Sequence, residues 1–510
     1  ISRSFTVGSD ATLTIYRSST AGYYYVYINN TTGNVGNLIN NGTINIDHQA
    51  ANGINYYLQF TYNNATGTIT NSGTIYVDLT GSSTSTNSYV YGNVTFNNTS
   101  GTVKTAATST SNANSVWMQY GSGAISGTSY GDQGWWLESG THTISGTVSL
   151  RSGATSGTPS LVVAGGTLTA NSTATVASLG FTSGIVNGTG TLTLNGLNWT
   201  GGVMRGTGST VMSGSGTYAL TTGVGTNETA PTIERTVTVG SDVTLTIYRH
   251  GTSGYNYIYI NSYTGNVGNL NNEGLINIRH ATSSTLDQNL SFWYGNTAGG
   301  TITNSGIIDV SLTNGTSSYV NNPYVSLSNA GGTIRTASAS DTVMTSVWSQ
   351  QANATFSGAG YGDRGLRISA GTSTFTGSVG LRSGATANTA SMVLDGSGAV
   401  ITVATGNTGT IGSLSMSAGT VNGAGTLVLN GLNWTGGLMS GTGSTSLSGS
   451  GVFSMTSGSG YGASGAPSIS RSFTVGSDAT LTIYRSSTAG YYYVYINNTT
   501  GNVGNLINNG

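Results

Sequence analysis

A long internal repeat constrains the fold of this chain more than any other feature of its sequence. Residues 1–42 return letter for letter as residues 469–510, and a diverged copy begins at Ile233. Between residues 1–48 and 233–280, 33 of 48 positions match. Serial copies of this kind are typical of repeat architectures, in which each unit packs on its neighbours. We interpret the chain as a window from a longer array, with units at 1–232 and 233–468 and the start of a third at 469–510.

The hydrophobic pattern predicts strands and no helices. In residues 11–16, Leu13 and Ile15 share one side of an alternating segment, and Thr12, Thr14 and Tyr16 share the other. Residues 23–28 alternate in the same way and are rich in aromatic and β-branched side chains, which strands favour. No segment repeats apolar residues at the three- and four-residue spacing of an amphipathic helix.

Short strands recur behind glycine steps such as Gly67-Thr-Ile, Gly101-Thr-Val and Gly166-Thr-Leu, at irregular spacings from 18 residues upward. We expect positive-φ turn positions at the steps that end in Gly73, Gly188 and Gly306. The pattern predicts an all-β, right-handed parallel β-solenoid, uncapped at both ends. Inward positions include Leu192 and Leu194 in one unit and Leu427 and Leu429 in the next, and asparagines at corners are expected to form amide ladders.

The segments Gly196-Leu-Asn-Trp-Thr-Gly-Gly-Val-Met and Gly431-Leu-Asn-Trp-Thr-Gly-Gly-Leu-Met, and the step Asn71-Ser-Gly-Thr-Ile, resemble repeats of giant bacterial surface proteins. These are β-helices similar to filamentous-haemagglutinin-type adhesins and autotransporter passengers. The resemblance covers most of the chain. It implies adhesion, matrix formation or surface extension, and an extracellular or cell-surface location.

Composition excludes several classes of function. The chain has 14 Lys and Arg against 15 Asp and Glu, a net charge of −1, so it lacks the clustered basic residues of a nucleic-acid surface. So little charge also favours self-association. The chain has no cysteine, and no apolar run is long enough to span a membrane.

The search for a chemical site finds one weak cluster, Asp132, Glu138 and His142. Its counterparts in the second unit are Asp363, Ser369 and Ser373, so only one unit carries it, and we expect solvated surface there and no catalytic residues. His48 and His280 are equivalent, but an acid lies beside one and a base beside the other, which argues against a metal site. No cofactor is expected. Asp10 and Asp242 are each expected to pair with the arginine seven residues on.

The aromatic residues suggest a contact surface. By strand parity, Tyr23, Tyr25 and Tyr27 project outward, and so do the corresponding residues of the second unit, Tyr255, Tyr257 and Tyr259. Such a triplet serves either as an anchor for protein contacts or as a solvated row that shields the strand. Trp199 and Trp434 are expected to close a corner against the stack, with a platform for carbohydrate as the alternative. Trp135 is expected inside and Trp136 exposed, because Arg367 stands at the latter position in the second unit.

These observations predict a non-enzymatic structural segment of an extracellular filament or giant repeat adhesin. Its expected partners are copies of itself and, for adhesion, surface glycans. A carbohydrate-active β-helix enzyme, of the polysaccharide lyase or hydrolase type, remains an alternative that requires an acidic groove. An ice- or crystal-binding surface is a further alternative that requires a regular threonine ladder in every coil.

Overall fold

The computed structural model is built from β-strands. It describes residues 1–17, 22–28, 36–48, 56–62, 67–79, 89–105, 116–126, 135–147, 161–223, 229–249, 254–260, 267–280, 288–293, 299–312, 319–336, 347–357, 366–376, 390–460, 465–486, 490–496 and 502–510. No helix occurs in these ranges. The chain divides into two compact units, Ile1–Leu245 and Thr246–Gly510, which are described separately.

The strands of the first unit are β1 (Ser4–Val7), β2 (Thr12–Arg17), β3 (Gly22–Tyr27), β4 (Asn37–Asn40), β5 (Thr43–His48), β6 (Tyr56–Thr61), β7 (Thr68–Asn71), β8 (Thr74–Asp78), β9 (Tyr89–Gly92), β10 (Thr95–Asn98), β11 (Thr102–Thr105), β12 (Val116–Gln119), β13 (Gly123–Ile125), β14 (Trp135–Leu137), β15 (Thr141–Thr147), β16 (Leu161–Val176), β17 (Leu179–Asn187), β18 (Thr191–Leu194), β19 (Leu197–Trp199), β20 (Val203–Met212), β21 (Tyr218–Thr221) and β22 (Thr232–Val239). The next strand, β23 (Thr244–Arg249), crosses the boundary between the units.

The strands of the second unit are β24 (Gly254–Ile260), β25 (Asn269–Asn272), β26 (Leu275–His280), β27 (Gln288–Trp293), β28 (Thr301–Asn304), β29 (Ile307–Ser311), β30 (Val320–Asn322), β31 (Ser326–Asn329), β32 (Thr333–Thr336), β33 (Trp348–Gln350), β34 (Ala354–Phe356), β35 (Leu366–Ile368), β36 (Thr372–Phe375), β37 (Met392–Leu394), β38 (Val400–Val403), β39 (Thr408–Ile411), β40 (Leu414–Met416), β41 (Thr420–Asn422), β42 (Thr426–Leu429), β43 (Leu432–Trp434), β44 (Leu438–Met439), β45 (Ser444–Leu447), β46 (Phe453–Thr456), β47 (Ser468–Ile469), β48 (Ser472–Val475), β49 (Leu481–Tyr484), β50 (Tyr495–Ile496) and β51 (Asn505–Asn508).

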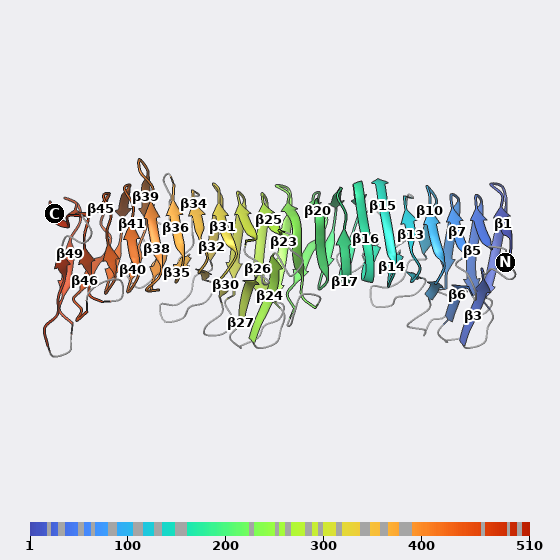
Figure 1. The fold of residues 1–510 in the computed structure, drawn as a ribbon, viewed down its shortest axis with the longest axis horizontal. Helices are drawn as coiled ribbons and strands as arrows, with labels where there is room; N and C mark the ends of the chain where they lie inside the picture. The colour runs from blue at the N-terminus through green and yellow to red at the C-terminus, as the bar shows by residue number, and fades with distance from the viewer. Residues whose placement is uncertain are drawn as a thin grey trace. The chain divides into compact units, whose positions relative to one another are not determined.

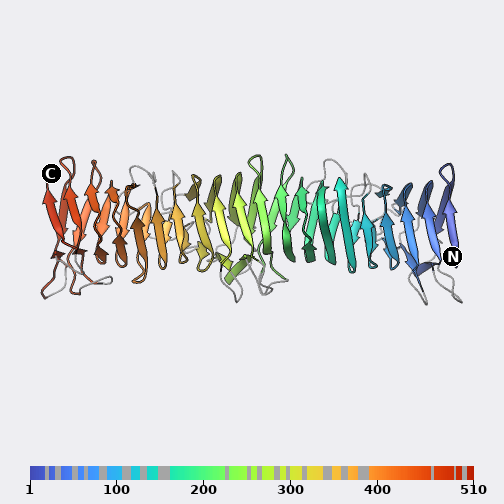
Figure 2. The same ribbon diagram turned by 45° about the horizontal axis from the view of Figure 1, so that its top comes forward.

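Each early coil of the first unit contributes one strand to each of three walls. The first wall runs through β1, β4, β7, β10, β13 and β15, the second through β2, β5, β8 and β11, and the third through β3, β6, β9, β12, β14 and β16. All these pairings are parallel, and strands of successive coils lie side by side in both views of the ribbon (Figures 1 and 2). Winding of this kind is a parallel β-solenoid, which confirms the predicted fold class. Its right-handedness stays a prediction.

The second unit repeats this construction. One wall runs from β24 through β27, β30, β33 and β35, and another from β25 through β28, β31, β34 and β36, again in parallel register. The third wall begins with β26, β29 and β32. In later coils, β39, β42, β45, β48 and β51 form a separate parallel sheet. The boundaries expected from the repeat, at residues 232 and 468, stay predictions.

The coils shorten along the first unit. Stacked partners Asn40 and Asn71 are 31 residues apart, whereas Thr191 and Ser209, later in the same unit, are 18 apart. The walls themselves keep strands of three to six residues early on, so the difference lies in the length of the connections between strands. Connections run over the surface and tolerate insertion, which explains why the glycine steps recur irregularly in the sequence.

The interior is a column of like side chains in register. Ile44 stands opposite Ile75 of the next coil, and Ile75 stands opposite Val103 of the coil after that. All three side chains are buried. The four leucines expected inside, at positions 192, 194, 427 and 429, are buried as predicted. Burying each such side chain contributes about 1.5–3 kcal/mol, and the in-register stack lets every coil do so against the next.

Asparagines form the expected amide ladders at one corner. In the first unit, Asn40 Nδ2 donates to Asn71 Oδ1 at 2.7 Å, and Asn71 Nδ2 donates to Asn98 Oδ1 at 2.6 Å. All three side chains are buried. The second unit has the same ladder through Asn272, Asn304 and Asn329, with the same two distances.

Two of the three glycines expected to have positive φ do not adopt it. Gly188 has the predicted positive φ of 113°, but Gly73 and Gly306 do not adopt positive φ. At Gly73 an added Cβ would lie 2.1 Å from the carbonyl oxygen of Gly42, and at Gly306 the same distance from Gly274. These glycines are therefore required by the close approach of the neighbouring coil's backbone and not by a left-handed turn.

Candidate contact surface

The outward side of the third wall in the first unit carries exposed tyrosines. Tyr23, Tyr25 and Tyr27 alternate along β3 with inward residues, so all three rings stand on the same side of the strand. Their exposed fractions are 55%, 49% and 42%. The ring centroids of Tyr25 and Tyr27 are 5.8 Å apart. The structure therefore places these three predicted residues together and open to solvent.

This tyrosine row continues onto the next coils. The parallel register sets Tyr23 opposite Tyr57 of β6, and Tyr57 opposite Tyr89 of β9. The ring centroids are 5.0 Å apart in the first pair and 5.8 Å in the second, and both pairs are stacked. Tyr91, also on β9, lies 5.8 Å from Tyr57 and 5.8 Å from Tyr120. We call Tyr23, Tyr57, Tyr89, Tyr91 and Tyr120 the tyrosine ladder.

Three phenols of the ladder, those of Tyr89, Tyr91 and Tyr120, have a raised pKa. Burial raises the pKa of Tyr91 well above its ordinary value, and the neighbouring phenol of Tyr23 adds to this effect. Burial likewise raises the pKa of Tyr89 and of Tyr120. A surface of uncharged rings with hydroxyl groups combines apolar area with hydrogen-bonding capacity, which is the chemistry of protein contact anchors.

The second unit departs from this arrangement and corrects a prediction. Tyr257 is half-buried, and Tyr259 is only 7% exposed, so Tyr259 does not extend an open row. One coil away, Trp293 stands opposite Tyr259, whereas Thr61 stands opposite Tyr27 in the first unit. The indole ring contacts Tyr257 edge-on at 5.7 Å. The side chain of Tyr255 lies outside the described residues.

Trp135 is buried and Trp136 is more exposed, as strand alternation predicts, but one expectation is corrected. Trp135 is buried and meets Phe96 edge-on at 4.8 Å. Trp136 is half-buried and not fully exposed as expected. Its partners in the neighbouring coils are Met118 and Val162, so it lies in an apolar row whose members cover one another.

Trp199 and Trp434 are buried in the stack, as predicted. Each indole N–H donates to the backbone carbonyl two residues on, Gly201 in one unit and Gly436 in the other, at 3.0 and 2.9 Å. With its N–H satisfied and its ring covered, neither tryptophan offers a platform for a ligand.

The weak acid and histidine cluster is not a catalytic constellation in the described part of the chain. His142 is fully buried in β15, where its Nε2 bonds the carbonyl oxygen of Ser139 at 2.8 Å, and burial lowers its pKa. Glu138 is half-buried directly after β14 of the third wall, whereas His142 belongs to β15 of the first wall, and burial raises the pKa of Glu138. Asp132 lies outside the described residues.

The described residues contain no group of three or more histidine and acidic side chains able to hold a metal ion. His280 is half-buried in β26, and its neighbour Arg279 forms an ion pair with Asp309 of the next coil. The side chain of His48 lies outside the described residues. Arg279, the arginine beside His280, is therefore paired with an acid of the adjacent strand.

The expected pairs of Asp10 with Arg17 and of Asp242 with Arg249 do not form. Asp10 is exposed, whereas Arg17 is buried with its guanidinium 4.7 Å from the ring centre of Tyr24. Asp242 accepts a hydrogen bond from the backbone N–H of Gly214 at 2.8 Å instead. Strand parity explains this, since seven residues place a turn aspartate and a strand arginine on different sides of the wall.

Sequence reasoning missed two buried arginines at the start of repeats. Arg235 donates to the carbonyl oxygens of Gly190 and Ser209 at 2.9 and 2.7 Å, and Arg471 donates to those of Gly425 and Ser444 at the same distances. Burial lowers the pKa of each guanidinium to about 10. The sequence signal that could have predicted these buried arginines is their recurrence at the third position of each repeat. Each guanidinium therefore links the backbones of two earlier segments through hydrogen bonds to their carbonyl oxygens.

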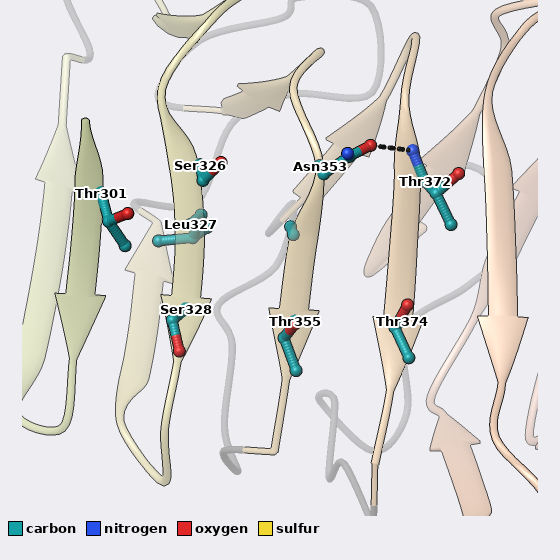
Figure 3. Close-up of a pocket in the computed structure, with 9 residues that line it drawn as sticks. Thr301, Ser326, Leu327, Ser328, Asn353, Thr355, Thr372 and Thr374 are labelled. Atoms are coloured by element: carbon teal, nitrogen blue, oxygen red, sulfur yellow. Dashed lines mark hydrogen bonds between the residues drawn. The ribbon is translucent and has the colours of Figure 1, made fainter. Parts of the chain in front are cut away.

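Shallow grooves lined by hydroxyl and amide groups lie on the outer walls of both units. In the second unit the lining includes Ser326, Asn353, Thr355 and Thr372, and the side-chain oxygen of Asn353 accepts from the backbone N–H of Thr372 at 3.0 Å (Figure 3). In the first unit, Ser122 receives the equivalent bond from Thr141, also at 3.0 Å, beside a groove that reaches Tyr120. The described residues that line the two grooves include no charged side chain.

No protein-family model, no curated protein and no solved structure matches this chain. In the part of the chain that the structure describes, no helical segment has the length and apolarity needed to cross a membrane.

Proposed function

We propose that this chain is a structural segment of an extracellular filament or giant repeat adhesin, which associates with further copies of itself through outward tyrosines. The observation that carries the proposal is the exposed row Tyr23, Tyr25 and Tyr27 on β3, extended across three coils by the tyrosine ladder. Aromatic residues are enriched at protein contacts because they bury a large area while losing little side-chain entropy.

The composition supports this role. With 14 basic and 15 acidic residues in 510, the chain has little charge to keep neighbouring copies apart. The parallel walls also supply a stiff support on which outward side chains keep a fixed spacing, as a filament contact requires. Adhesion to surface glycans would use the same exposed rings and the uncharged grooves beside them.

The two alternative functions have less support. A carbohydrate-active enzyme needs two carboxyl groups held about 5–10 Å apart in a groove, and both described grooves are lined without acids. An ice-binding face needs parallel rows of threonine. The second wall of the first unit has one such row, Thr12, Thr43, Thr74 and Thr102, but the adjacent row reads Thr14, Asn45, Tyr76 and Lys104.

The test replaces the three tyrosines of β3 with serine and measures association by sedimentation and electron microscopy across a range of protein concentrations. The triple variant should associate less than the unmodified chain while keeping its β-rich circular dichroism spectrum. Tyr16→Ser is the matched control, because Tyr16 is 61% exposed on a different wall. Undiminished bundling by a folded triple variant would remove the row from the mechanism.

A further inference from the structure

The tyrosine ladder has a geometry that its role as a contact surface does not require. Tyr23 and Tyr57 are stacked, with ring centroids 5.0 Å apart and planes inclined by only 21°. Tyr57 and Tyr89 repeat this at 5.8 Å and 28°. These pairs join successive coils, because each ring comes from a different strand of the third wall.

We propose that Tyr23 and Tyr57, with Tyr89 as the next member, form a site of oxidative cross-linking, at which a peroxidase-type one-electron oxidant joins adjacent coils through dityrosine. The modification would be made within one chain, so it stands whether or not copies of the chain associate through Tyr25 and Tyr27.

The chemistry balances with hydrogen peroxide as the terminal oxidant. Each phenol loses one electron and one proton to give a phenoxyl radical, whose spin density extends to the carbons ortho to the oxygen. A carbon–carbon bond then forms between one ortho carbon of each ring, and the two hydrogens on those carbons shift to the oxygens as the rings regain aromaticity. Overall, two phenols lose two electrons and two protons, which reduce one peroxide to two waters.

The positions of the rings favour this coupling over competing reactions. Tyr23 is 55% exposed, so an oxidant in solution can reach it, while Tyr57 is half-buried directly beside it. Two radicals held at stacking distance react with one another before either meets a second chain. The product would be a covalent link between coils in a chain that has no cysteine and therefore no disulfide.

The second unit provides a control within the same chain. The residue opposite Tyr255 in the next coil is Asn289, which occupies the place that Tyr57 holds in the first unit. Among the described rings there, Tyr257 and Trp293 of successive coils meet edge-on at an interplanar angle of 77°. Cross-coil dityrosine is therefore expected in the first unit and not at this place in the second.

The test treats the full chain, at low concentration, with a haem peroxidase and limiting hydrogen peroxide. Cleavage on the amino side of aspartate then separates Tyr23, Tyr57 and Tyr89, because Asp47 and Asp78 lie between them. Mass spectrometry should find a Tyr23–Tyr57 or Tyr57–Tyr89 linked pair of peptides lighter by two hydrogens, and the oxidised chain should unfold at a higher temperature.

Tyr57→Phe keeps a stacked ring but removes the phenol, so it should abolish both links, whereas Tyr257→Phe should leave them unchanged. Tyr23→Phe gives a second readout, since it should remove the first link and spare the one to Tyr89. The proposal is overturned if dityrosine appears only between chains or only at other tyrosines, or if none forms under conditions that cross-link free tyrosine.

Discussion

Phe5 and Phe473 occupy the same place in two identical 42-residue sequences, yet Phe5 is 45% exposed and Phe473 is fully buried. The difference lies in the neighbouring strands. Among the described strands, β1, which carries Phe5, pairs with β4, whereas β48, which carries Phe473, lies between β45 and β51. Because the local sequence is the same, the pair isolates how much an adjacent coil contributes to burial.

We therefore predict unequal costs for the same substitution at these two positions. Phe473→Ala should lower the free energy of unfolding by about 3–5 kcal/mol, the usual range for a buried phenylalanine. Phe5→Ala should cost about half as much, because Phe5 is already 45% exposed. Chemical denaturation of both variants, with hydrogen exchange to localise the change, measures the difference. Equal losses would mean that stacking between coils does not determine stability here.

The buried asparagine ladder gives a second prediction. Asn71→Ala removes the acceptor of Asn40 Nδ2 and the donor to Asn98 Oδ1, so two buried polar groups lose a partner. The expected cost is about 2–3 kcal/mol of unfolding free energy, measured by denaturant titration. Asn41→Ala, an exposed asparagine in the adjacent turn, is the control and should change stability by less than about 0.5 kcal/mol. A ladder variant as stable as this control would show that the amide bonds contribute nothing.

Buried His142 should make the first unit sensitive to acid. Burial lowers its pKa in the folded chain below the ordinary value of 6.5, so the unfolded chain binds more protons as the pH falls below about 6.5. Its contribution to stability is therefore fully present above that pH and is lost on acidification. The second unit has Ser373 at this place, also fully buried.

Substitution by the residue of the other unit tests this sign. The variant His142→Ser should unfold at a midpoint that changes less between pH 7 and about pH 5 than the midpoint of the unmodified chain, as followed by circular dichroism. Comparing the two proteins cancels the opposite contribution of Glu138, whose pKa is raised by burial. A steeper loss of stability on acidification in the variant would contradict the assignment.

The sequence predicts the architecture because the architecture is local and periodic. Alternation over segments such as 190–195 places Leu192 and Leu194 inside, and the glycine step at Gly188 gives the positive-φ turn that follows from its sequence. The ladder asparagines were predictable in kind, since stacked identical amides satisfy one another.

What the sequence could not predict depends on residues one coil away. Tyr259 has the same parity as Tyr27 but is buried, and it stands opposite Trp293, which lies 34 positions further along the chain and becomes a neighbour only through the register of β24 and β27. In the sequence Arg235 is likewise an ordinary strand residue, and only the fold brings the carbonyl oxygens of Gly190 and Ser209 to it. When coils differ in length, no local sequence pattern predicts which residues of neighbouring coils stand opposite each other.

Residue-resolved hydroxyl-radical footprinting tests the proposed contact surface most directly. The chain is exposed to radicals in dilute and in associated form, and cleavage before aspartate keeps Tyr16 and the β3 row together on residues 10–46. Our account predicts that oxidation of Tyr23, Tyr25 and Tyr27 falls severalfold on association, while oxidation of Tyr16, exposed on another wall, stays the same. Association that leaves the β3 row as reactive as before, or that protects Tyr16 equally, would contradict it.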